Sequence, residues 1–185
     1  MRLEPGRKAP DIEGSDVSSG SVSPRDLVGR TVILKFYRFA ACPICNLHVR
    51  ELVRRAGELE AAGVVPVAVL HSPAHRLRKS LDGYQVPFTV IADPEKCLFR
   101  AYGVESSLGG MFTGAVARDY GRAMRAGIFC RPIGHEGGVQ GHPADFLIDS
   151  EGVLRPARYG RDYADTMGVD AVLDAATAMR AHQPS

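Results

Sequence analysis

Short runs of hydrophobic residues alternate along the chain with segments in which apolar positions recur every three or four residues. Three runs, at residues 31–37, 64–70 and 88–91, predict strands, and the first two are continuous enough to be buried on both faces. Pro66 interrupts the second run, so we expect that strand to begin near Val67. The alternation predicts a parallel central sheet with helices on both faces.

The helical segments lie after these strands. They span residues 42–63, 72–81 and 97–102, and Gly63 and Gly103 close the first and the third. Before the first strand, the opening stretch is rich in Gly, Pro, Ser and Asp and predicts an irregular arm.

The alternation breaks in the second half of the chain. We expect residues 105–140 to form an insertion with a helix at 111–126 followed by a glycine-rich loop. Residues 144–149 and 153–159 predict two strands joined by Asp-Ser-Glu-Gly, which is a hairpin signal, and residues 169–182 predict a closing helix. The hairpin adds an antiparallel edge to the sheet.

These elements predict an α/β fold with a central mixed sheet flanked by helices, in one domain that spans residues 1–185. In the helix of the insertion, one stripe carries Phe112, Val116, Tyr120 and Met124. We expect this stripe to pack against the sheet. The alternatives are a homodimer contact and an apolar pocket over the cysteines described below.

Composition narrows the class of protein. Of 185 residues, 45% are hydrophobic and 24% are charged, which is typical of globular proteins. No apolar run approaches the roughly 20 residues of a membrane-spanning helix, and the first 30 residues lack the apolar core of a secretory signal. The formal charge is only +2, with no block of like charge. We therefore expect a cytoplasmic protein without nucleic-acid or membrane partners.

The candidate chemistry is the Cys42-Pro43-Ile44-Cys45 motif between a buried strand and an amphipathic helix. Unpaired N–H groups and the helix dipole at this position stabilise a thiolate at Cys42. Cys45 lies one turn further on, within disulfide distance, and Pro43 suits the first helical turn because it has no N–H to leave unpaired. A C-x-x-C at this place in an α/β chain indicates a dithiol redox site.

Two other interpretations of the motif are weaker. Inert core cysteines rarely come as a capped pair. A zinc site would need His71 and His75 as further ligands, and the gap of 25 residues between the two pairs is twice that of a common zinc finger. We therefore expect no metal and no organic cofactor.

At these residues the chain resembles the peroxiredoxin-like proteins of the alkyl hydroperoxide reductase/thiol-specific antioxidant superfamily, in particular a branch with C-P-x-C after F-Y-R. The resemblance rests on Thr31–Glu51 and extends over most of the chain outside residues 12–22 and 105–140. The further matching segments are Pro5–Asp11, Phe88–Val104, Gly141–Arg155 and Tyr159–Asp165.

The resemblance implies a thioredoxin-like fold and further residues near the two cysteines that support the active site. It implies a loop beside them with a cis-proline, for which Pro143 after His142 is the best candidate. The family pattern P-x-x-x-T/S-x-x-C is not kept, because Lys35 and Phe39 stand at its proline and hydroxyl positions. Arg38 is a candidate for the arginine of the family; its alternative is a solvated residue at the strand end.

Four single residues complete the expectations. His71 ends the second strand, either as a proton shuttle near Cys42 or as a histidine without a ligand. His48 is expected to be exposed and Cys97 to be a buried small hydrophobe. Cys130, in the glycine-rich loop, is a possible additional resolving thiol.

The sequence thus predicts a peroxiredoxin-like antioxidant in which the Cys42 thiolate reduces a peroxide and Cys45 resolves the product. The first alternative is a thiol–disulfide oxidoreductase acting on protein or small-molecule disulfides. The second is a non-catalytic redox-sensing module. Both enzyme hypotheses, the peroxidase and the thiol–disulfide oxidoreductase, require a thioredoxin- or glutathione-type thiol as the reductant.

Overall fold

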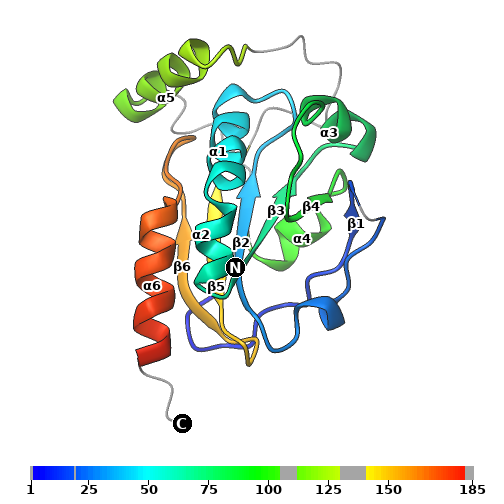
Figure 1. Cartoon of the computed structure of the whole chain (residues 1–185), viewed down its shortest axis with the longest axis vertical. Coiled ribbons are helices and arrows are strands. Elements are labelled where there is room, and N and C mark those ends of the chain that lie inside the picture. The colour runs from blue at the N-terminus through cyan, green and yellow to red at the C-terminus, as the bar shows by residue number, and fades with distance from the viewer. Residues whose placement is uncertain (1, 19, 105–111, 130–140, 182–185) are drawn as a thin grey trace.

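The computed structural model describes residues 2–18, 20–104, 112–129 and 141–181. Within these residues one mixed sheet runs through the middle of the molecule in the order β1-β4-β3-β2-β5-β6 (Figure 1). β2, β3 and β4 are parallel, whereas the β1–β4, β2–β5 and β5–β6 pairs are antiparallel. The predicted mixed sheet is therefore confirmed. Its strands are β1 (Ser15–Asp16), β2 (Thr31–Tyr37), β3 (Val64–Leu70), β4 (Thr89–Ala92), β5 (Ala144–Ile148) and β6 (Leu154–Tyr159).

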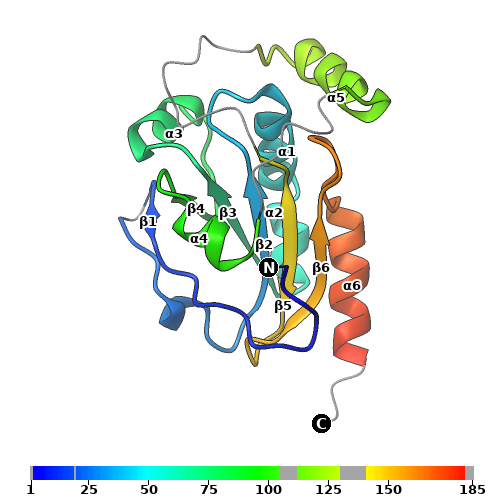
Figure 2. The ribbon, with the colours of Figure 1, turned by 180° about the vertical axis from the view of Figure 1, so that it is seen from behind.

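Helices cover both faces of this sheet. One face packs against α1, α2, α3 and α6, and the other against α4 and the N-terminal arm. Figures 1 and 2 show these two faces from opposite sides, with α5 at the end of the molecule near the start of α1. The described helices are α1 (Pro43–Arg54), α2 (Ala56–Ala61), α3 (Ala74–Ser80), α4 (Cys97–Ala101), α5 (Gly114–Arg125) and α6 (Val169–Ala181).

β2 is buried along almost its whole length, and this burial on both faces explains its apolar run. Ile33 and Tyr37 point to the helical layer that contains α1, while Leu34 and Phe36 point to the layer of α4. Because successive side chains point to opposite faces, a strand covered on both sides needs apolar residues at nearly every position.

Three local predictions were wrong. β3 begins at Val64 rather than near Val67, and Pro66 lies inside it. β4 pairs with β3 only from Val67 onward, so Pro66 lies in a stretch of β3 that β2 borders and β4 does not. The expected first helix is divided at Arg55 into α1 and α2, and the arm contains the short strand β1.

Only half of the predicted stripe lies on the inward face of α5, where Val116 is buried and Tyr120 is partly buried against the core. α5 buries Val116, Asp119 and Ala123, whereas Phe112 and Met124 of the expected stripe are 94% and 59% exposed. The reason lies in α1, where His48 is buried and its Nε2 lies 3.2 Å from a carboxylate oxygen of Asp119. The expectation of an exposed His48 was therefore wrong.

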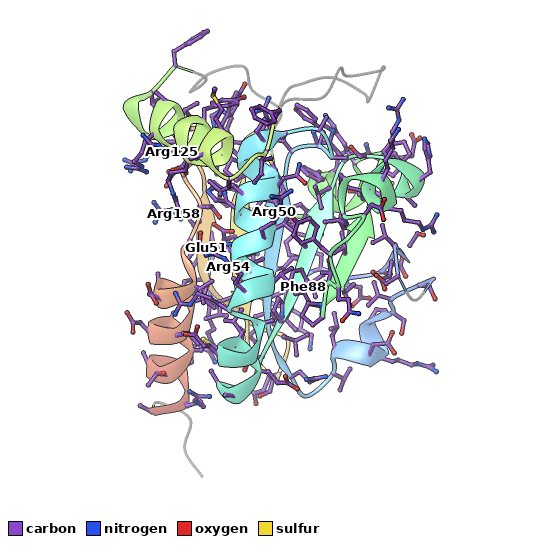
Figure 3. The ribbon with its side chains drawn as sticks, turned by 45° about the horizontal axis from the view of Figure 1, so that its top comes forward. Arg50, Glu51, Arg54, Phe88, Arg125 and Arg158 are labelled. Atoms are coloured by element: carbon purple, nitrogen blue, oxygen red, sulfur yellow. The ribbon has the colours of Figure 1, made fainter. Side chains whose placement is uncertain are left out.

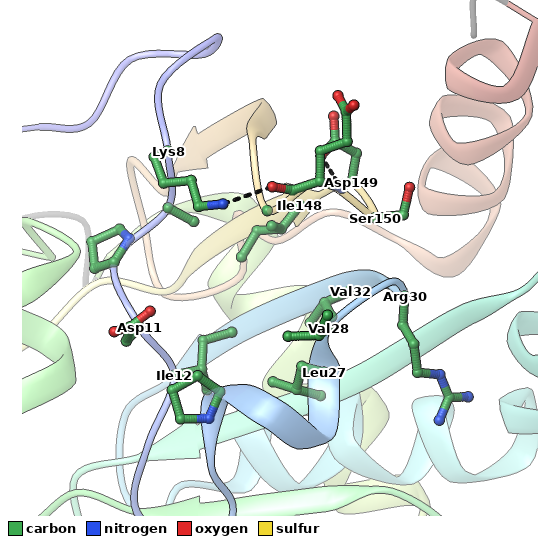
Figure 4. A pocket seen from close by; sticks show the side chains of 15 residues that line it. Lys8, Asp11, Ile12, Leu27, Val28, Arg30, Val32, Ile148, Asp149 and Ser150 are labelled. Atoms are coloured by element: carbon green, nitrogen blue, oxygen red, sulfur yellow. Dashed lines mark hydrogen bonds between the residues drawn. The ribbon is translucent and has the colours of Figure 1, made fainter.

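A cavity of about 170 Å³, shown in Figure 4, lies beside the beginning of β2. Its walls include Val32 and Ile148, which pair at the beginning of β2, and the Nζ of Lys8 donates to the main-chain carbonyl of Glu151 beside it. The cysteines follow the other end of β2, about 20 Å away along a seven-residue strand. The cavity is therefore not part of the dithiol site.

A buried ion pair joins the two central antiparallel strands. Lys35 of β2 and Asp145 of β5 face each other in register, and the Lys35 Nζ lies 2.6 Å from a carboxylate oxygen of Asp145. The ammonium also donates to the Met167 carbonyl at 2.8 Å, and the Thr166 hydroxyl donates to the carboxylate at 3.0 Å. The pair thereby fixes the segment before α6 to the middle of the sheet.

We expect Asp145→Asn to lower the free energy of unfolding by about 3–5 kcal/mol, because it leaves the buried Lys35 ammonium uncompensated. Urea unfolding at neutral pH measures this. Glu58→Gln, which breaks the exposed pair of Glu58 with Arg55, is the matched control and should lower the free energy of unfolding far less, because solvent screens that pair. Equal losses in the two variants would show that the buried pair does not hold the sheet together.

Candidate active site

Cys42 is the N-cap residue of α1. Its Sγ accepts a hydrogen bond from the main-chain N–H of Cys45 at 3.4 Å, and Pro43 occupies the first helical position. The turn before it closes through a bond from the Cys42 N–H to the Phe39 carbonyl, at 3.0 Å. The predicted strand-to-helix junction is thus present, and it directs the Cys42 sulfur at the free N–H groups of the first turn.

The two sulfurs lie against each other. The Cys45 thiol donates to the Cys42 Sγ at a distance of 2.8 Å, and both side chains are buried. Both cysteines are free in this structure. Because a disulfide bond is about 2.05 Å long, only a small movement separates this dithiol from its oxidised form.

Arg38 lies over the Cys42 sulfur. One guanidinium nitrogen is 4.0 Å from the Sγ, and the side chain is almost completely buried. The guanidinium stacks on the ring of Tyr163, 3.6 Å from its centroid, and lies 5.0 Å from the centroid of Phe39. The alternative of a solvated strand-end arginine was therefore wrong.

These contacts set the charge of the site. Burial by itself raises the pKa of Cys42, but the thiol of Cys45, the Arg38 charge and the N–H groups of Ile44 and Cys45 outweigh it, so that the pKa falls to about 7. The pKa of Cys45 is raised well above its ordinary value, first by burial and then by the Cys42 sulfur. Near pH 7 the Cys42 thiol is therefore partly ionised, whereas Cys45 remains a thiol.

The ring of Tyr163, on which Arg38 stacks, is itself packed against other residues. The ring of His142 meets Tyr163 edge-on at 5.7 Å, and the His142 Nδ1 lies 2.8 Å from the Gly160 carbonyl. The Pro143 carbonyl accepts from the Gly160 N–H at 2.8 Å. No cis peptide bond occurs among the described residues, so the expectation of a cis Pro143 was wrong. The contact of His142 with Tyr163 thus links this loop to the ring on which Arg38 stacks.

Tyr163 is the site residue that sequence reasoning did not single out. Its segment, Tyr159–Asp165, matches the family pattern, but nothing in the sequence pairs it with Arg38. Gly160 allows the segment before Tyr163 to pass close to Pro143. A Cβ at position 160 would lie 2.6 Å from the carbonyl oxygen of Asp165 and 2.8 Å from that of Pro143. Within the described part of the chain, the buried Tyr163 hydroxyl has no hydrogen-bond partner.

His71 is buried between the rings of Phe39 and Phe99, at 5.9 and 5.6 Å. The main-chain N–H of His71 donates to the main-chain carbonyl of Arg38 at 3.0 Å. Neither nitrogen of the imidazole ring has a hydrogen-bond partner among the described residues. Burial, together with the charges of Lys96 and Arg38, lowers the pKa of His71 to about 4. The imidazole is thus neutral at pH 7 and lies behind the site.

The remaining candidate ligands and thiols are not assembled here. In the described ranges, no group of three or more His, Cys, Asp or Glu side chains is placed to hold a metal ion. Cys97 is exposed at the start of α4, so the expectation of a buried Cys97 was wrong. Cys130 lies outside the described residues. None of the helices in the described residues is long and apolar enough to cross a membrane.

Comparison with known proteins places this geometry in context. A family model described as AhpC/TSA family matches residues 5–157. A protein of Mycobacterium tuberculosis named as a candidate peroxiredoxin is 30% identical over 102 residues, which are 55% of this chain and 65% of that protein. A candidate bcp peroxiredoxin of Coxiella burnetii is 29% identical over 104 residues, 56% of this chain and 69% of that protein. The chain thus spans about two thirds of the length of these relatives.

Solved structures agree with the fold. A cysteine-to-serine mutant of the peroxiredoxin 6 of Arenicola marina superposes with a TM-score of 0.72 at 14% identity, over 96% of this chain and 74% of that one. A candidate thiol:disulfide interchange protein DsbE of Chlorobium tepidum gives 0.64 at 25% identity, over 94% of this chain and 99% of that one. The predicted thioredoxin-like fold is confirmed.

We expect Arg38→Met to raise the pKa of Cys42 from about 7 by about one pH unit or more, because the guanidinium charge stabilises the thiolate. Thiolate ultraviolet absorbance against pH, with Cys42→Ser as the baseline, gives this pKa. Arg38→Lys keeps the charge and should move the titration less. An unchanged midpoint in Arg38→Met would mean that Cys45 and the helix N–H groups alone set the pKa.

Proposed function

Because the chain belongs to the AhpC/TSA family, we propose that it is a peroxiredoxin-like oxidoreductase that reduces peroxides through the Cys42 thiolate, with Cys45 as the resolving cysteine. The observation that carries the proposal is the arrangement of three groups. The Cys42 sulfur is the cap of α1, lies 2.8 Å from the Cys45 sulfur and lies 4.0 Å from the Arg38 guanidinium.

The first step uses the low pKa of Cys42. The thiolate attacks the terminal oxygen of the hydroperoxide, the O–O bond breaks, and the alkoxide leaves as an alcohol after taking one proton. Cys42 becomes a sulfenic acid. In this proposal the Arg38 guanidinium, 4.0 Å from the Cys42 sulfur, stabilises the thiolate and the negative charge that develops on the leaving oxygen.

The second step uses the high pKa of Cys45, which keeps its proton until it is needed. The Cys45 sulfur attacks the sulfenic sulfur, its proton leaves with the hydroxyl as water, and the Cys42–Cys45 bond forms. The two thiols have then supplied the two electrons that reduce the peroxide. An external dithiol, or two molecules of a monothiol, returns the pair to the reduced form.

The support for Arg38 bears on a departure from the family pattern. Phe39 stands where the family has a hydroxyl, and its ring packs against Arg38. The buried hydroxyl near Arg38 is that of Tyr163, on whose ring the guanidinium stacks. We propose that Arg38, held between these two rings, takes over the positioning of the peroxide.

The environment of the reaction follows from the chemistry. A thioredoxin- or glutathione-type thiol is the proposed reductant, since the disulfide must be reopened in each cycle. Such reductants keep thiols reduced in the cytoplasm, which we propose as the compartment.

A second candidate is thiol–disulfide exchange. It is favoured by Phe39 in place of the hydroxyl and by the likeness to the DsbE-type structure, whose title names thiol:disulfide interchange. In that reaction Cys42 attacks a substrate disulfide, one substrate thiol leaves, and Cys45 releases the other by closing the intramolecular bond. The same two sulfurs serve both reactions, so kinetics must separate them.

We expect reduced protein to lose two thiols per hydrogen peroxide in a stopped-flow reaction that Cys42→Ser abolishes. The Cys45→Ser variant should stop at a Cys42 sulfenic acid, which dimedone traps as a mass adduct. Cys97→Ser removes an exposed thiol outside the pair and serves as the control with unchanged kinetics.

A rate no faster than that of free cysteine thiolate at the same pH would overturn the peroxidase proposal. Exchange would then be tested directly, because Cys45→Ser should accumulate a mixed disulfide at Cys42 with a disulfide substrate.

A further inference from the structure

A groove of about 600 Å³ lies between α1 and α5, outside the dithiol site. Its apolar surface comes from Leu47 and Val53 on α1 and from Ala126 and Ile128 at the end of α5. Tyr84 closes one side. The volume falls within the roughly 300–1,000 Å³ of typical small-molecule sites.

Guanidinium groups surround this apolar surface. Figure 3 shows Arg50 and Arg54 on α1 and Arg125 on α5, all of which line the groove together with Arg122. Among the described residues, no acidic side chain lines it. The lining thus combines apolar contact area with a positive charge that an uncharged or cationic ligand would leave unpaired.

The four arginines differ in what they already bind. Arg122 is paired with Asp119 at 3.2 Å and lies 3.8 Å from Glu51, and Arg50 stacks on the ring of Tyr84 at 4.4 Å. Arg54 and Arg125 are exposed, and in the described parts of the chain neither has a carboxylate partner. These two side chains are therefore available to an anionic group.

A second cavity of about 140 Å³ adjoins the groove, and Arg50 and Ile128 line both. It extends to Ala40 and Ala41, directly before Cys42, and the exposed ring of Phe129 lies on its border. Along α1 the two cavities span from the first turn to Arg54, about 12 Å at 1.5 Å per residue. An elongated ligand fits this path better than a compact one.

We propose that the groove binds an anionic amphiphile, a medium-chain fatty acyl carboxylate. Its carboxylate binds Arg54 and Arg125, its chain lies on Leu47, Val53 and Ile128, and its far end reaches the loop before Cys42. One carboxylate satisfies two guanidinium groups, and charge-assisted bonds of this kind are the strong ones. An acidic protein segment would bring several carboxylates to a surface that is mainly apolar.

Isothermal titration of the reduced 185-residue chain with laurate, kept below its micelle concentration, tests the proposal. We expect saturable binding with one laurate per chain. Arg54→Ser/Arg125→Ser should weaken it about tenfold or more, because two charge-assisted bonds are lost. Arg7→Ser/Arg25→Ser removes the same charge from exposed positions outside the groove and should leave the affinity unchanged.

Ligand controls separate the contributions of chain and charge. Butyrate offers the carboxylate without the chain, and dodecyltrimethylammonium offers the chain with the opposite charge, so both should bind at least about tenfold more weakly than laurate. Equal binding of laurate by the groove variant, or of the cationic amphiphile by the native chain, would overturn the proposal. So would binding of a polyglutamate peptide in the absence of laurate binding, since the occupant would then be an acidic protein segment.

The titration needs no turnover and no oxidation of the cysteines. A Cys42→Ser/Cys45→Ser chain should bind laurate with the same affinity as the native chain, whether or not the dithiol reduces peroxides. Loss of laurate binding in this variant would show that the ligand sits on the sulfurs rather than in the groove.

Discussion

The cap of α1 by a sulfur atom is the interaction on which the site depends. An N-cap side chain satisfies one of the N–H groups that a helix cannot bond internally, and serine or aspartate oxygens usually do this. Here the Cys42 Sγ takes that place, and the N–H of Cys45 is its partner. A thiolate accepts such a bond more strongly than a thiol does, so the start of the helix and the ionisation of the sulfur stabilise each other.

The surroundings of the cap explain why one of the two cysteines ionises and not the other. Both are buried, and burial alone would raise both pKa values. Cys42 has the helix N–H groups, Arg38 and the Cys45 thiol as donors, whereas Cys45 faces the Cys42 sulfur and keeps its proton, which it donates in a hydrogen bond to that sulfur. The asymmetry is therefore positional: two identical side chains, three residues apart, receive different roles from one helix terminus.

Much of this was predictable from the sequence, and the reason is local. The apolar run at 31–37, the Cys-Pro start of α1 and the Asp-Ser-Glu-Gly hairpin each express a constraint that acts within a few residues. What the sequence did not disclose depends on partners far along the chain. Arg38 is buried because Tyr163 lies over it, and His48 is buried because Asp119 pairs with it.

The same distinction explains the error over the stripe on α5. A stripe of apolar residues predicts the buried face of a helix only when the helix packs on an apolar surface. The surface of α1 that faces α5 contains His48 as well as Leu47. The contact with His48 turns Asp119 inward, and Met124, five residues further along, is turned to solvent with it. The contact of Asp119 with His48 therefore also determines which side of α5 is exposed. Arg125 lies on the exposed side and lines the groove beside α1.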